Sequence, residues 1–250
     1  MPFADKVAVV TGAAGDIGAA VARALWERGT ALLAVDDDAD KLDSLGRELG
    51  GAEMFVADLT RGVDVAAYAA RACELWGGID LFFNNVDCEG PPVLLEDQSE
   101  AAFDEMITTN LRATFLGLKH VLPHVRDGGA IVNTASDLAF VGAAGLGGYV
   151  ASKHGVLGLT KVAALECERR GIRVNAICPT RVREIVLDDD APRSVSFGAV
   201  DADGFRTAEE VTDLVIFLLS DGGPLRHRPE AHLDQAVPAA FIGANGSVVP

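Results

Sequence analysis

Apolar residues along the chain follow two alternating patterns. Short runs rich in Val, Ile, Leu and Ala are each followed by a longer segment in which apolar residues recur every three or four positions. The short runs predict β-strands, and the longer segments predict amphipathic helices, several of which end at glycine. Strands are expected at residues 6–11, 31–35, 53–57, 79–83, 130–134, 172–177 and 241–249, and helices at 16–28, 40–49, 63–76, 100–125, 149–170 and 207–219.

This alternation predicts the fold class. Strands that are apolar on both faces belong to parallel sheets that helices cover on both sides. Right-handed crossovers then give an α/β fold with a doubly wound parallel sheet of Rossmann type, in three layers α/β/α. No segment has the composition of a linker, so residues 1–250 are expected to form one domain that binds its ligands beyond the carboxyl ends of the strands.

Composition and charge narrow the range of partners. The chain has 49% apolar and 23% charged residues, and its formal net charge is −16. Such an acidic chain repels nucleic-acid phosphates and anionic membranes, so neither is expected as a partner. No apolar run reaches the roughly 20 residues that span a bilayer. The four cysteines have neither disulfide density nor metal-ligand spacing, so we expect a cytoplasmic protein without a metal site.

A glycine-rich segment follows the first predicted strand. Its candidate ligand contacts are Gly12, Gly15, Asp16, Ile17 and Gly18. Glycines at this point let the backbone turn sharply and approach a pyrophosphate closely, and the N-terminus of the next helix offers free N–H groups and the positive end of its dipole. The placement between a strand and a helix therefore predicts a dinucleotide-binding loop.

Carboxylates follow the second and third predicted strands. Asp36 ends the second strand, where a carboxylate can accept both ribose hydroxyls of an adenosine and would repel a 2′-phosphate. No Arg or Lys lies in the glycine loop or directly after this strand to bind such a phosphate, so NAD is expected rather than NADP. Asp58 is placed to accept from the adenine amino group, with Leu59 lining the ring.

A Tyr–Lys pair stands at the start of the predicted helix 149–170. Tyr149 and Lys153 are four residues apart and therefore share one helical face. Free tyrosine has a pKa of about 10, so acid–base chemistry at neutral pH needs a lower pKa, which an adjacent ammonium favours. Ser136, after the fifth strand, is placed to hydrogen-bond a substrate oxygen. The three residues predict proton transfer to or from such an oxygen.

From residue 6 to about residue 185 the chain resembles the short-chain dehydrogenase/reductase family. The resemblance rests on the glycine loop, Asp36, Asp58, Asn84-Asn85, Asn110, Ser136, Tyr149, Lys153 and the run Ile-Arg-Val-Asn at 172–175. It implies that Tyr149 is the general acid/base, that Lys153 lowers its pKa and binds the nicotinamide ribose, and that Ser136 orients the carbonyl. By the same resemblance Asn110 would hold a water of the proton relay, and Asn85 would belong to the cofactor site.

The resemblance also implies an activity and an assembly. Hydride would pass between NAD and a secondary alcohol or ketone, in a homo-oligomer that is a tetramer or a dimer. A loop over about 180–206 is expected to cover the substrate. The apolar residues between Ser136 and Tyr149 suit a carbocyclic or aliphatic secondary alcohol; they are Leu138, Phe140, Val141 and Leu146.

Four departures from the family pattern leave two alternatives open. The middle glycine of the loop, Gly15, stands one residue early, and the usual Asn-Asn-Ala-Gly run ends in Val86-Asp87. Thr180 replaces a Gly and Glu184 replaces a Thr that commonly meets the carboxamide, and the usual Val-Asp-Gly-Gly-like ending is missing. The alternatives are a catalytically weak NAD(H)-binding regulatory protein on the same fold, and an epimerase or dehydratase with retained NAD.

Overall fold

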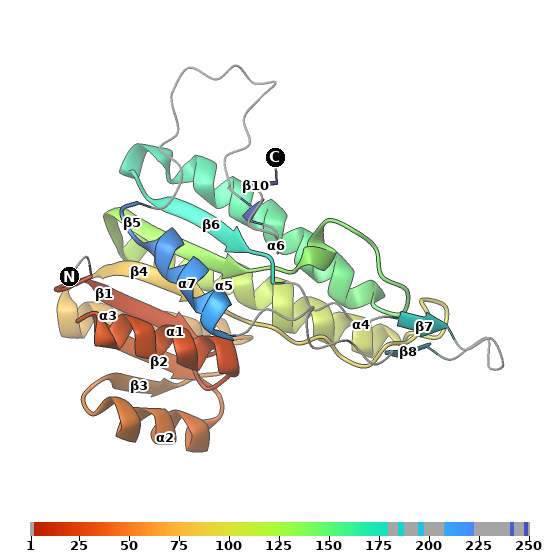
Figure 1. Ribbon diagram of the computed structural model, residues 1–250, viewed down its shortest axis with the longest axis horizontal. Helices are drawn as coiled ribbons and strands as arrows, with labels where there is room; N and C mark the ends of the chain where they lie inside the picture. Colours follow the sequence, from red (N-terminus) through yellow and green to blue (C-terminus); the bar gives the residue numbers. More distant parts are fainter. Residues whose placement is uncertain are drawn as a thin grey trace.

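The computed structural model describes residues 3–179, 185–187, 195–197, 208–222, 241–242 and 248–249. Its main sheet has eight strands in the order β10-β9-β6-β5-β4-β1-β2-β3 (Figure 1). β10 is antiparallel to its neighbour, and the other pairs are parallel. The strands are β1 (Val7–Thr11), β2 (Ala31–Asp36), β3 (Glu53–Val56), β4 (Ile79–Asn84), β5 (Val125–Thr134), β6 (Arg173–Ile177), β9 (Phe241–Ile242) and β10 (Val248–Val249).

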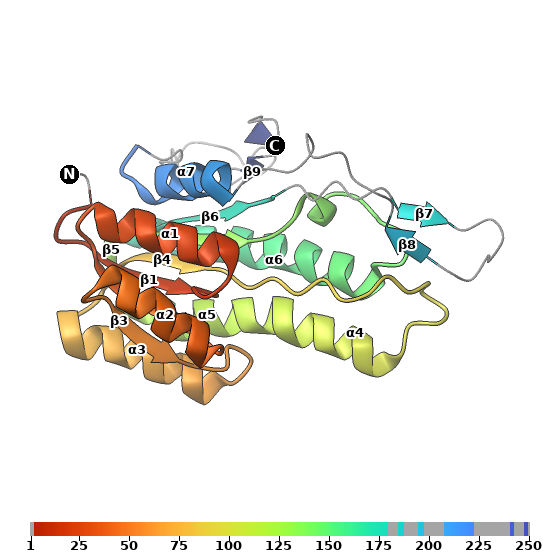
Figure 2. The same cartoon turned by 60° about the horizontal axis from the view of Figure 1, so that its bottom comes forward.

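Helices cover both faces of this sheet, which confirms the predicted three-layer, doubly wound fold. One layer holds α1 (Asp16–Glu27), α2 (Ala39–Leu49) and α7 (Ala208–Leu219). The other holds α3 (Gly62–Trp76), α5 (Ala113–Val121) and α6 (Gly147–Glu166), and Figures 1 and 2 show the sheet between the layers. Alternate strand residues face alternate layers, so Ala8 and Val10 join one core cluster while Val9 joins the other. This two-sided burial explains why the strands are apolar throughout.

The predicted helix 100–125 differs most from the observed structure. It comprises α4 (Glu100–Met106), a π-helical turn at Ile107–Arg112, α5 and a short 3-10 turn at Leu122–His124. Pro123 stands inside this last turn, where its ring and its missing N–H end the helix. Val125, predicted as helical, already pairs with Ile79 in the sheet.

The last predicted strand, 241–249, also differs. Its described residues form β9 and β10, which run antiparallel to each other, with β9 beside β6. Of the predicted substrate loop 180–206, the structure describes β7 (Ile185–Leu187) and β8 (Val195–Phe197), an antiparallel pair. Thr180, Glu184 and the rest of that loop lie outside the described residues.

Candidate active site

Glycines fold the loop between β1 and α1. Gly12 has φ +60°, and a Cβ on it would lie 2.8 Å from Asn85 Nδ2. A Cβ on Gly18 would overlap the Gly12 carbonyl oxygen and lie 2.7 Å from the carbonyl carbon. Gly15 is the N-cap of α1, and a Cβ there would make only an ordinary contact, 3.5 Å from the Gly12 oxygen. The loop thus presents the free N–H groups at the start of α1, which suits a phosphate.

A cleft of about 410 Å³ opens beside this loop. Gly18 is buried behind it. The other residues predicted from sequence to bind the cofactor's adenosine and pyrophosphate, together with Asn85, line the cleft: Gly12, Gly15, Asp16, Ile17, Asp36, Asp58, Leu59 and Asn85. The tertiary structure adds lining residues that the sequence reasoning did not place there: Lys41, Thr60 and Thr109. The cleft therefore joins the ends of β1, β2, β3 and β4, as a doubly wound sheet requires.

Asp36 holds the glycine loop against the end of β2. Its Oδ2 accepts from Ala14 N at 2.9 Å, and its Oδ1 accepts from Asp38 N at 3.0 Å. Burial and the neighbouring Asp36 carboxyl raise the pKa of Asp37. At the rim, Lys41 Nζ lies 2.9 Å from Asp38 Oδ2 in an exposed ion pair. The sequence analysis did not identify Lys41, because the geometry of helix α2, not adjacency to Asp36 in the sequence, brings this residue to the cleft.

Asp58 lies at the same cleft after β3. Its Oδ1 accepts from Thr60 N at 2.8 Å and from Thr60 Oγ1 at 2.6 Å. These bonds to the charged form lower the pKa of Asp58. The site thus keeps an ionised acceptor where an adenine amino group was expected.

Asn85 ties three strand ends together. Its Nδ2 donates to Gly12 O at 3.4 Å, its Oδ1 accepts from Thr134 Oγ1 at 2.8 Å, and its N–H donates to Thr11 Oγ1 at 2.9 Å. The glycine loop is therefore braced from β4 and β5 as well as from β2.

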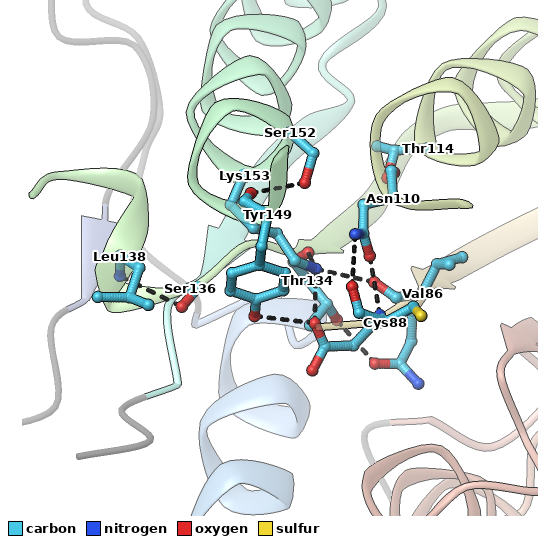
Figure 3. A network of polar contacts seen from close by, with 12 residues as sticks. Val86, Cys88, Asn110, Thr114, Thr134, Ser136, Leu138, Tyr149, Ser152 and Lys153 are labelled. Carbon is cyan, nitrogen blue, oxygen red and sulfur yellow. Dashed lines mark hydrogen bonds and ion pairs between the residues drawn. The ribbon is translucent and has the colours of Figure 1, made fainter. Parts of the chain in front are cut away.

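Tyr149 and Lys153 project from the first turns of α6 toward the end of β5 (Figure 3). Lys153 has a side chain with no exposed surface, and its Nζ donates to Val86 O at 2.9 Å and to Thr134 O at 3.1 Å. The Nζ also lies 5.6 Å from the centre of the Tyr149 ring. The predicted pair is thus brought together, with the ammonium buried beneath the phenol.

Asp87 completes this group, and the sequence reasoning missed its contact. The Tyr149 hydroxyl donates to Asp87 Oδ1 at 2.9 Å, and Lys153 Nζ lies 3.1 Å from the same oxygen. The prediction that the pKa of Tyr149 is lowered is wrong: burial raises it first, and the negative charge of Asp87 raises it further. The carboxylate compensates the ammonium that was expected to favour the phenolate. The departure from Asn-Asn-Ala-Gly was the available sequence signal.

Ser136 lies at the end of β5, where the 3-10 turn Asp137–Ala139 begins. Its side chain lies near the Tyr149 phenol (Figure 3), and its hydroxyl lowers the pKa of Tyr149, against the effects of burial and Asp87. Ser136 Oγ also donates to Asp137 Oδ1 at 3.1 Å and accepts from Leu138 N at 3.2 Å. Burial raises the pKa of Asp137. The hydroxyl is held by its own turn beside the acid–base candidate.

Asn110 lies inside the π-helical turn and is fully buried. Its Oδ1 accepts from Cys88 N at 2.9 Å, and its Nδ2 donates to Cys88 O at 2.7 Å (Figure 3). The side chain thereby fixes the backbone next to Asp87. Widened turns of this kind are frequent at functional sites.

The arrangement joins a dinucleotide-type cleft to a Tyr–Lys–Ser group. The sequence profile of the short chain dehydrogenase family matches residues 6–190. The chain belongs to this family. Similar proteins are named as reductases and dehydrogenases, and the chain is accordingly an oxidoreductase acting on CH–OH and C=O groups.

Three similar proteins carry informative names. Levodione reductase of Leifsonia aquatica is 34% identical over 96% of each chain, and a crystal structure of levodione reductase has a TM-score of 0.76 over 88% of this chain and 92% of that one. Cis-4-hydroxycyclohexanecarboxylate dehydrogenase of Sinomonas cyclohexanicum is 38% identical over 88% of this chain and 91% of its own. A crystal structure of NAD⁺-bound xylitol dehydrogenase is 29% identical with a TM-score of 0.76, covering 88% and 94% of the two chains.

Within the described ranges, no helix is both long and apolar enough to cross a bilayer. The same part of the chain holds no group of three or more His, Cys, Asp or Glu side chains arranged to bind a metal ion. His227 and His232 lie outside the described residues.

Proposed function

We propose that the chain is an NAD-dependent oxidoreductase that interconverts a secondary alcohol and a ketone, with Tyr149 as general acid/base. The observation that carries the proposal is the meeting of Tyr149, Lys153 and Ser136 next to a cleft whose loop excludes a Cβ at Gly12 and Gly18. Glycine is needed there for the loop's own shape, and that shape leaves backbone N–H groups facing the cleft. The residues present therefore fit a dinucleotide.

Each site residue has a chemical task in this proposal. Bound NAD supplies the hydride acceptor, and NADH the hydride donor. Tyr149 takes the alcohol proton in oxidation and gives a proton to the carbonyl oxygen in reduction. Ser136 hydrogen-bonds the same oxygen. Lys153 is buried beneath the Tyr149 ring and, as the family implies, would bind the nicotinamide ribose. Asn110 positions the backbone at Cys88 and, as the family implies, a water of the relay.

The acidic end of the cleft supports NAD over NADP. Asp36, Asp37 and Asp58 all line the wall that would receive the adenosine ribose. A 2′-phosphate there would add about two negative charges beside carboxylates. Lys41 is paired with Asp38 rather than placed against Asp36. NADH is therefore expected to bind more tightly than NADPH.

The substrate is proposed to be a cyclic or aliphatic secondary alcohol or its ketone. The names of levodione reductase and of cis-4-hydroxycyclohexanecarboxylate dehydrogenase point to ring substrates for these relatives. In this chain Phe140 and Val141 remain partly exposed next to Ser136, and Leu146 is buried before Tyr149. This apolar wall supports a carbocyclic substrate.

The test compares two Tyr→Phe variants, since the chain has two tyrosines. Tyr149→Phe is expected to abolish NAD-linked turnover of cyclic alcohols while NADH binding, followed by nicotinamide fluorescence, persists. Tyr68→Phe is the matched control, because Tyr68 is a residue of α3 buried in the core, and this variant should keep its activity.

Three results would redirect the assignment. Normal turnover by Tyr149→Phe would overturn the role of Tyr149. NADH binding without any turnover in the wild type would favour the regulatory alternative. Substrate consumption without net NADH formation would favour an epimerase or dehydratase with retained NAD.

We also propose a homo-oligomer, dimer or tetramer, formed by a second copy of this chain. Phe115 of α5 and Val162 and Leu165 of α6 are each about half exposed, and a largely apolar hollow lies between α5 and α6. The same face on two copies can pair about a two-fold axis. A monomeric mass by light scattering would overturn this.

Compartment and domain organisation complete the proposal. All four cysteines lie in the described part of the chain and are free thiols, which supports a cytoplasmic location. One main sheet joins strands from both ends of the chain, which supports a single domain over residues 1–250.

A further inference from the structure

One oxygen of Asp87 is shared by two groups of the site. Asp87 Oδ1 accepts from the Tyr149 hydroxyl at 2.9 Å and lies 3.1 Å from Lys153 Nζ. Asp87 stands in the loop after β4 and lines the cleft, and about a quarter of its side chain is exposed, at 26%. The carboxylate therefore stands between the buried ammonium and the cleft, in direct contact with the phenol.

The ammonium of Lys153 meets three acceptors in this arrangement. Its Nζ meets two backbone oxygens, Val86 O and Thr134 O, in addition to Asp87. An ammonium has three N–H donors, and three acceptors surround this one. Because the carboxylate is the one charged partner among these three, it compensates the positive charge that would otherwise stabilise a phenolate.

The Tyr149 hydroxyl makes a charge-assisted hydrogen bond. A carboxylate accepts only from a phenol that keeps its proton, and such bonds are about twice as strong as neutral ones. Loss of the proton would place two negative oxygens next to each other in a largely buried site. The contact therefore favours the protonated phenol.

Some groups that face Tyr149 from the neighbouring elements raise its pKa, and one lowers it. The loop after β4 contributes the carboxylates Asp87 and Glu89, and both raise the pKa of Tyr149, as does burial. The end of β5 contributes Ser136, whose hydroxyl lowers it. Lys153 comes from α6 itself, and Asp137 lies behind Ser136. The carboxylates and burial outweigh the serine, because the pKa is raised overall.

We propose that Asp87 is a positioning residue that keeps the proton on Tyr149 throughout the working pH range, by binding its hydroxyl and neutralising Lys153. The proposal rests on the proposed function of Tyr149. In reduction, the hydride that bound NADH would supply, leaving NAD⁺, forms the new C–H bond, the Tyr149 O–H bond breaks, and its proton forms the alcohol O–H. The phenolate left behind regains a proton from water. Oxidation reverses each step and needs the phenolate first.

The proposal predicts how the rate of each reaction direction depends on pH, and it predicts no preference for reduction or oxidation. An enzyme leaves the equilibrium constant of its reaction unchanged, so Asp87 cannot favour one direction at a given pH. With Tyr149 held protonated, kcat/KM for ketone reduction should stay constant with pH, and kcat/KM for alcohol oxidation should rise with pH without a plateau. Removing the charge of Asp87 should bring a plateau in oxidation and a decline in reduction within the measured range.

The first test is a spectroscopic titration that needs neither substrate nor cofactor. Phenolate absorbance is followed against pH in the wild type and in Asp87→Asn, which keeps the size and an acceptor oxygen. Tyr68 is fully buried with a raised pKa, so its phenolate appears late in both proteins. We expect phenolate from Tyr149 to appear at least about one pH unit lower in Asp87→Asn, a tenfold larger phenolate fraction at a given pH. Adding Tyr149→Phe should remove this signal.

Two further variants control the comparison. Glu89→Gln removes a carboxylate from the same loop and should shift the titration less, because Glu89 has the smallest effect on Tyr149. Asp87→Gly restores the glycine usual in the family at this position and should shift it at least as far as Asp87→Asn. Circular dichroism identifies a variant that does not fold, and Asp87→Gly then replaces Asp87→Asn as the deciding variant.

Unchanged phenolate onset in the folded Asp87 variants would overturn the proposal. The kinetic profiles form the second arm, measured with saturating NAD or NADH. If the wild type oxidises no alcohol and reduces no ketone, the proposed function fails while the titration still decides the role of Asp87. If turnover is normal and the profiles of Asp87→Asn match those of the wild type, this inference alone fails.

Discussion

The glycine loop allows a sharp test with two substitutions three residues apart. Gly18→Ala places a methyl group in the first turn of α1, where it would overlap the Gly12 carbonyl oxygen and lie 3.0 Å from Ala13 Cα. The three atoms nearest to it are all backbone atoms. Gly12 cannot retreat, because it is itself packed against Asn85. We therefore expect the loop to move away from its observed path.

The magnitude follows from two opposing contributions. Overpacking against a backbone that cannot yield costs about 3 kcal/mol, the upper end for an added methyl group. Alanine is better than glycine inside a helix by about 1 kcal/mol. The net loss of unfolding free energy is therefore about 2 kcal/mol, or roughly 4–8 °C in Tm for a chain of this size. Helix propensity alone would predict a gain.

Gly15→Ala is the matched control. Its Cβ would lie 3.5 Å from the Gly12 oxygen, and its φ of −82° suits any residue. The unfolding free energy of the protein without cofactor should stay within about 0.5 kcal/mol of the wild type. If its Cβ obstructs a bound pyrophosphate, NADH affinity falls without loss of stability, whereas Gly18→Ala loses both.

Urea unfolding without cofactor and NADH fluorescence titration measure the two properties separately. Gly18→Ala with wild-type stability would refute the reasoning, since the overlap with Gly12 would then cost nothing. Equal destabilisation by Gly15→Ala would refute it as well, because the cost would come from glycine in general and not from the close approach.

Three other predictions concern the cleft, the core and alkaline pH. Asp36→Asn should shift the ratio of NADPH to NADH affinity by about 2 kcal/mol, roughly 30-fold, toward NADPH, because one carboxylate no longer repels the 2′-phosphate. Asn133→Ala should cost about 3 kcal/mol in urea unfolding, because it removes buried bonds of 3.0 Å to both Asn84 Nδ2 and Thr160 Oγ1. Burial raises the pKa of Tyr68, so its stabilisation is complete below the unfolded value of about 10 and is lost above it, by about 1.4 kcal/mol per pH unit; Tyr68→Phe should remove that part of the alkaline slope.

Each of these has a contradicting result. An unchanged cofactor ratio in Asp36→Asn would mean that the ribose lies elsewhere. A loss below about 1 kcal/mol in Asn133→Ala would mean that water satisfies the buried groups. Parallel pH–stability curves for Tyr68→Phe and the wild type would mean that Tyr68 ionises equally in the folded and unfolded chains.

The sequence by itself determined the fold and the approximate location of the site. Continuous apolar strands require helices on both faces, and that requirement predicted the observed three layers. The glycine loop, Asp36 and the Tyr149–Lys153 spacing were readable because their geometry depends on local backbone periods. The local sequence pattern was wrong about the helix at 100–125. It predicted one unbroken helix, but a π-helical turn and Pro123 divide it.

The tertiary structure alone decided the electrostatics of the site. Lys41 reaches the cleft from α2, and Asp87 reaches Tyr149 across 62 positions of sequence. A pKa depends on every charge within a few ångströms and on burial, and neither quantity follows from the spacing of one helix. The sequence therefore paired Tyr149 with Lys153, but burial first and the Asp87 carboxylate second raise the pKa of Tyr149, opposite to the predicted direction.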